Sequence, residues 1–90
     1  MWATPEWWTW ELEFSPHLLK RMIDRAFNEA DLRAMFDDVY GYRPDQEEGR
    51  WVLSTQWHGR KWEIIVEPVR SERLLVVVTA YPVDGPSVGV

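Results

Sequence analysis

The chain has 90 residues, 46% of them hydrophobic, and contains seven tryptophans and no cysteine. This length and composition predict one globular domain, 1–90, with its core at about residues 8–82 and an irregular tail at 83–90, and they exclude disulfides and thiolate catalysis. The chain has 15 acidic and 10 basic side chains and a net charge of −5. This charge argues against binding of DNA and against tight binding of long RNA.

The sequence also limits which ligands and which cellular compartment we expect for this protein. Only two histidines are present, and they are isolated from each other, so we expect no metal site and no cofactor. No apolar run approaches the roughly 18 residues of a membrane span, and residues 1–10 lack the basic start and the continuous apolar segment of a signal peptide. We therefore expect a cytoplasmic protein without membrane contact.

The first predicted elements are a strand followed directly by a helix. Apolar and polar residues alternate over residues 8–14, which is typical of a half-buried strand. Ser15 then supplies an N-cap, and Pro16 occupies the favoured first helical position. The pattern predicts a helix over residues 16–27.

A second helix follows almost without a loop. Asn28 is its predicted N-cap, with Asp31 three residues later in a capping-box position, and apolar residues repeat at helical spacing until Gly41. Residues 41–49 have loop composition and no periodicity. They predict a surface connection between the helices and the rest of the sheet.

Three runs rich in Val, Ile, Trp and Thr complete the chain, at residues 50–58, 61–68 and 74–81. Short turns between them predict an antiparallel meander, in which the last run, apolar on both faces near its start, is central. The predicted fold is α+β in the order β-α-α-β-β-β, with two helices packed on one face of an antiparallel sheet of about four strands.

Basic residues gather on the first predicted helix. His17, Arg21 and Arg25 fall within about 80° of one another around its axis, and Lys20 adds a further cation. With Asp24 as the only acid, residues 15–25 carry a local charge of +2 in an otherwise acidic chain. A histidine beside arginines suits phosphate chemistry, but the same pattern also suits an ordinary solvated helix face.

The order of these elements resembles a bacterial domain family of unknown function within the RelE-like, barnase–EndoU–colicin–RelE superfamily of RNase toxins. The likeness spans about residues 10–81. It rests on His17, Arg21 and Arg25 in the first helix and on Thr79 and Tyr81 in the last strand. The acidity of this chain departs from such toxins, which are commonly basic, and so does its Trp-rich start.

The resemblance implies a metal-independent ribonuclease of a toxin–antitoxin or related system, with RNA as substrate and an antitoxin protein as partner. His17, Arg21 and Tyr81 are the implied catalytic residues, and Lys20, Arg25 and Thr79 the implied substrate-binding residues. In such a site His17 would serve as base or acid, while the arginines hold the phosphate.

The tryptophans support an alternative function. Four crowd into residues 2–10 and three lie on the predicted strands, at Trp51, Trp57 and Trp62. Most should be core, but two helices cover only one sheet face, so some indoles are left for a partner, a second copy of the chain or a base. The second hypothesis is therefore a non-catalytic interaction domain of the same fold, possible as a homodimer.

Overall fold

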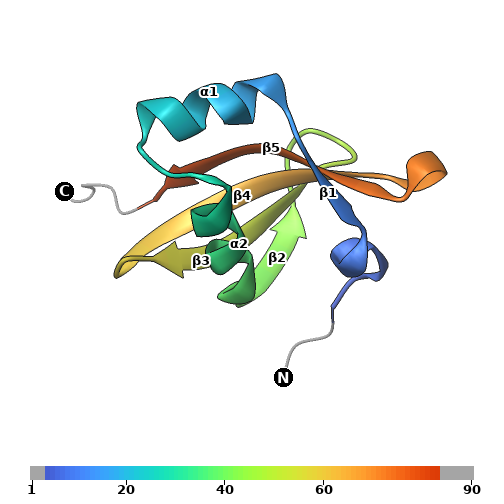
Figure 1. Ribbon diagram of the computed structural model, residues 1–90. Helices are drawn as coiled ribbons and strands as arrows, with labels where there is room; N and C mark the ends of the chain where they lie inside the picture. Colours follow the sequence, from blue (N-terminus) through green and yellow to red (C-terminus); the bar gives the residue numbers. More distant parts are fainter. Residues whose placement is uncertain (1–3, 84–90) are drawn as a thin grey trace.

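The computed structural model describes residues 4–83, which form an α+β fold with two helices and a five-stranded sheet (Figure 1). In chain order the elements are η1 (Glu6–Thr9), β1 (Glu11–Phe14), α1 (Pro16–Asp24), α2 (Glu29–Asp37), β2 (Gly41–Pro44), β3 (Trp51–Trp57), β4 (Arg60–Val69), η2 (Arg70–Glu72) and β5 (Leu74–Pro82). The predicted tail beyond Val83 and the indole of Trp2 lie outside the described residues.

The sheet is mixed, and its strand order is β1-β5-β4-β3-β2. Strands β2 to β5 form an antiparallel meander, as predicted, whereas β1 pairs with β5 in parallel, from Glu11 opposite Leu74 to Phe14 opposite Val77. The expectation of a purely antiparallel sheet is therefore wrong. Periodicity reports which side chains share a face and carries no information on strand direction, which depends on the return path through the helices.

The extra strand is β2, in the segment predicted to be a loop. Its four residues read Gly-Tyr-Arg-Pro, a turn-like composition, and they become a strand by pairing with β3, with Gly41 opposite Ser54 and Pro44 opposite Trp51. Pro44 is tolerated because β2 is an edge strand. Only the remaining residues, 45–50, form the connection to β3.

The chain start also differs from the predicted strand, because residues 6–9 form the 3₁₀ turn η1 and β1 begins only at Glu11. Trp8 N–H donates to the carbonyl of Pro5, and Trp10 N–H to that of Trp7. Residues three apart lie on the same side of a 3₁₀ turn. Trp7 and Trp10 are therefore both buried, at 4% and 7% exposure, where a strand would have sent them to opposite faces.

Both helices begin at the predicted caps. Ser15 Oγ accepts from the N–H of Leu18, with Pro16 as the first helical residue, and Asn28 and Asp31 form a reciprocal capping box at the start of α2. The first helix ends at Asp24, three residues earlier than predicted. The backbone of Ala26 turns left-handed there, with a φ of 57°.

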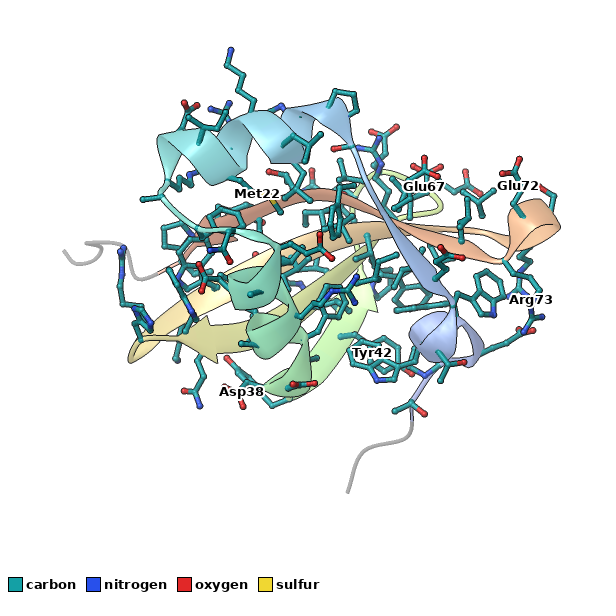
Figure 2. All side chains as sticks on the ribbon, in the orientation of Figure 1. Met22, Asp38, Tyr42, Glu67, Glu72 and Arg73 are labelled. Carbon is teal, nitrogen blue, oxygen red and sulfur yellow. The ribbon has the colours of Figure 1, made fainter. Side chains whose placement is uncertain are left out.

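The helices share one hydrophobic core with one face of the sheet. Leu18 from α1 and Leu32 and Met35 from α2 are fully buried in it. Figure 1 shows α1 lying along β5, with α2 in front of the central strands, and Figure 2 shows Met22 pointing from α1 toward the sheet. Between residues 4 and 83, no helix is long and apolar enough to cross a bilayer.

Candidate functional site

The first turn of α1 is fastened directly to β5. Besides capping the helix, Ser15 donates its hydroxyl proton to the carbonyl of Val78, at 2.7 Å, and its own N–H bonds to the carbonyl of Val77. The pairing of β1 with β5 ends at Val77. Beyond that residue, the start of α1 contacts the edge of β5 in place of β1. His17 lies in this first turn and is exposed to solvent.

The far end of α1 is fastened to the same strand. Arg25 Nη1 donates to the carbonyl of Ala80 at 2.8 Å. The anchored carbonyls of Val78 and Ala80 flank Thr79, so the row of basic residues on α1 runs along the β5 edge at that position. This contact gives Arg25 a structural function, and its remaining guanidinium N–H groups are available to an anion.

The other basic residues of α1 lie at or near its surface. Arg21 is half-buried and pairs with Asp24 across one helical turn, at 3.1 Å. The side chains of His17 and Lys20 form no hydrogen bond or ion pair with any residue in the described part of the chain. At the helix start, Pro16 has no N–H and that of Leu18 is taken by Ser15, so few backbone donors remain for a phosphate.

Tyr81 belongs to a polar network across the sheet. Its hydroxyl donates to Glu63 Oε1 on β4 at 2.8 Å, and Arg43 on β2 forms an ion pair with the other carboxylate oxygen at 3.1 Å. Burial, followed by the hydrogen bond and the charge of Glu63, raises the pKa of Tyr81 to about 12. The phenol is thus protonated up to strongly alkaline pH and acts as a hydrogen-bond donor.

This network lies on the sheet face opposite the helices. Glu63 and Glu67 alternate along β4 with Trp62, Ile64 and Val66, which belong to the core, so the two carboxylates point to the other side. On that face Arg50 also pairs with Glu67, at 3.2 Å. The alternation is visible in the sequence and marks Glu63 and Glu67 as residues of the second face.

The structure thus brings the elements that carry the six predicted site residues together, but it does not link all six side chains. The backbone brings α1 and β5 side by side, and Thr79 and Tyr81, two residues apart on β5, share the polar face. Within residues 4–83, however, no hydrogen bond or ion pair links His17, Lys20 or Arg21 to either β5 side chain. Tyr81 bonds across the sheet, and Glu63 and Arg43, which complete its network, are absent from the sequence-based site.

A separate cavity of about 420 Å³ lies where η1 and β1 meet the last turn of α2. Its apolar wall includes Trp8, Leu12, Phe36 and Val39, and the rings of Trp8 and Phe36 pack 5.7 Å apart. The other tryptophans mostly build the core: Trp7, Trp10 and Trp62 are buried, and Trp51 and Trp57 pack against it. Trp8 is half-buried and lines this cavity.

His58, the second histidine, lies at the tip of the β3–β4 hairpin. It adopts a φ of 53° next to Gly59, and its ring stacks on Trp57 at 4.0 Å. In the described residues no group of three or more His, Cys, Asp or Glu side chains is placed to hold a metal ion.

Comparison with known proteins provides no relative with which this site can be compared. No family model matches the chain, and searches of curated proteins and of solved structures found no match.

Proposed function

We propose that this chain is a metal-independent ribonuclease-like toxin of a bacterial toxin–antitoxin or related system, acting on RNA in the cytoplasm. The observation that supports it is the double attachment of α1 to β5, through Ser15 to Val78 and through Arg25 to Ala80. It holds the exposed His17 and the row of arginines along the edge of the strand that carries Thr79 and Tyr81.

In this proposal each residue has a defined chemical part. His17 takes the proton of the ribose 2′-hydroxyl or supplies one to the leaving 5′-oxygen, and Arg21 stabilises the charge of the phosphate. Arg25, Thr79 and Lys20 contact the substrate. Tyr81, whose pKa is raised to about 12, contributes a hydrogen bond rather than a mobile proton.

The test compares induced expression of the wild-type protein and of His17→Ala in a bacterium. We expect the wild type to arrest growth and to degrade cellular RNA, whereas His17→Ala does neither although it accumulates to the same level. The matched control is His58→Asn, which removes the chain's other imidazole at a hairpin tip where Asn tolerates a positive φ. This control should be as toxic as the wild type, and intact RNA in all three strains would refute the ribonuclease.

A second candidate function is that of a non-catalytic interaction domain, whose partner is another protein or a second copy of the chain in a homodimer. Two contacts favour it, because Arg21 is already neutralised by Asp24 and the Tyr81 hydroxyl is already committed to Glu63. Both groups would have to exchange an internal partner for the substrate. Harmless expression with intact RNA, together with a specific binding partner, would establish this candidate over the first.

A further inference from the structure

The outer edge of β1 presents backbone groups that pair with no other strand within residues 4–83, because β1 stands at one end of the strand order (Figure 1). Successive residues of a strand direct their N–H and C=O groups to opposite sides. The N–H of Ser15 bonds to the carbonyl of Val77 on β5. Phe14 and Leu12, one and three residues before it, therefore direct their N–H and C=O groups away from β5.

The opposite edge of the sheet is less suited to a further strand. There the N–H of Asp45 bonds to the carbonyl of Arg50, so Pro44 lies at an outward-facing position of β2. Proline has no N–H to donate and is typical of edges that are protected against further pairing. β1 contains no proline, so its backbone can continue the ladder of hydrogen bonds.

The side chains of β1 give this edge a negative charge. Leu12 and Phe14 are half-buried and pack against the core, so Glu11 and Glu13 point to the opposite face of the sheet. Both glutamates are exposed, and neither side chain forms a hydrogen bond or ion pair in the described part of the chain. The residues opposite them on β5 are Leu74 and Val76, which carry no charge.

A second copy of the chain is a poor occupant of this edge. Residues opposite each other in an antiparallel pair lie on the same face of the sheet. Two β1 strands paired with their apolar residues on the core face would place a glutamate of one copy opposite a glutamate of the other, which is destabilising. RNA is also disfavoured, because its phosphates would meet the same carboxylates. The occupant that charge favours is a basic segment of another protein.

We propose that the outer edge of β1 binds an extended basic segment of a partner protein, which joins the sheet as a further strand. Its backbone pairs with the N–H and C=O groups of Leu12 and Phe14. Its side chains alternate, so that Lys or Arg lie beside Glu11 and Glu13 and apolar residues lie on the core face. The inference deepens the interaction candidate, on which it rests, and does not require RNA cleavage.

The test starts with selection from a random peptide library displayed on phage, with the wild-type protein immobilised. The enriched peptides should alternate basic and apolar residues. The double variant Glu11→Lys, Glu13→Lys should bind a selected peptide at least about tenfold more weakly. The matched control, Glu47→Lys with Glu48→Lys, makes the same charge change in the exposed β2–β3 connection and should bind like the wild type.

Amide hydrogen exchange, followed by NMR on the wild-type protein, tests the backbone pairing. In the free protein the N–H groups of Leu12 and Phe14 should exchange faster than that of Glu13, which faces β5. The selected peptide should slow exchange at Leu12 and Phe14 by at least about tenfold. This measurement needs no substitution, so it decides even if the double variant does not fold.

The proposal is overturned by enriched peptides that lack the alternating basic pattern, by equal binding to the wild type and a folded double variant, or by unchanged exchange at Leu12 and Phe14 with the peptide bound. Displacement of the peptide by an RNA oligonucleotide would also overturn it. His17→Ala should bind the peptide at wild-type strength. Loss of toxicity in that variant and loss of peptide binding in the double variant therefore report on separate sites.

Discussion

The Tyr81 phenol has a pKa raised to about 12 by burial and by its hydrogen bond to Glu63. It projects from β5 on the sheet face opposite the helices and donates its proton to Glu63, whose second carboxylate oxygen pairs with Arg43. Such a chain of charge-assisted hydrogen bonds fixes the orientation of all three side chains. Tyr81 therefore has a structural function in the sheet. Any catalytic function of Tyr81 must be compatible with its hydrogen bond to Glu63.

This arrangement predicts how stability depends on pH. The folded pKa of Tyr81, about 12, lies above its ordinary value of 10.0, so its contribution to stability is complete below pH 10.0 and is lost as the pH rises toward about 12. Tyr81→Phe should therefore lower the free energy of unfolding by about 1 kcal/mol at neutral pH, and the difference should shrink in strong alkali. Chemical denaturation at several pH values measures it, and a difference that does not change with pH would contradict the assignment.

A second prediction at this scale concerns the backbone of Ala26. This residue adopts a φ of 57° after α1, where the N–H of Phe27 bonds to the carbonyl of Met22 and that of Ala26 to the carbonyl of Ile23. The pattern is a Schellman motif, whose left-handed position favours glycine. Ala26→Gly should raise the free energy of unfolding by about 0.5–1 kcal/mol in a denaturant titration.

Its matched control has the opposite sign. Ala34 is exposed in the interior of α2, where glycine loses more conformational entropy than alanine. Ala34→Gly should lower the free energy of unfolding by about 1 kcal/mol. Equal effects of the two substitutions would show that the left-handed turn is not what ends α1.

At the scale of elements, the helices could be predicted from the sequence because their signals are local. Ser15, Pro16, Asn28 and Asp31 act within one turn of their own positions, and each behaves as expected. The four-residue strand β2 has no such signal, because its hydrogen bonds are supplied by β3. Apolar and polar residues alternate from η1 into β1, so the sequence pattern does not distinguish the 3₁₀ turn from the strand. Only the burial of both Trp7 and Trp10 distinguishes them.

The attachment of α1 to β5 gives the prediction for this scale. Ser15→Ala removes both the helix cap and the hydrogen bond to Val78, so we expect the free energy of unfolding to fall by about 1–2 kcal/mol. Ser71→Ala, at an exposed position in η2, should change it by less than about 0.5 kcal/mol. Thermal melts followed by circular dichroism compare the two, and a Ser15 effect no larger than that of Ser71 would argue against the attachment.

At the scale of the whole molecule, one core connects every layer. Leu18 from α1, Met35 from α2 and Leu53 from β3 belong to the same buried cluster. Thr55, also fully buried, donates its hydroxyl proton to the carbonyl of Met35 and so ties β3 to the end of α2. Neither helix has a core of its own, so neither is expected to unfold separately.

This shared core predicts one cooperative transition. Tryptophan fluorescence reports the core and circular dichroism the backbone, and the two should give the same midpoint in a thermal melt. A fluorescence transition that clearly precedes the loss of secondary structure would show that η1 and its indoles detach first. Glu6 and Arg70, which link η1 to η2 at 2.8 Å, are the contact to examine in that case.

The sequence by itself determined the α+β class, the caps of both helices, the three long strands and the concentration of positive charge on the first helix, because each follows from near neighbours or from a simple period. Only the tertiary structure decided the direction of β1, the existence of β2, the partners of Tyr81 and Arg25, and the cavity beside α2. All of these depend on contacts between residues far apart in the chain: Arg25 meets Ala80, and Tyr81 meets Glu63. A periodic pattern shows which face a side chain occupies, but what lies opposite that face is set by how the layers pack.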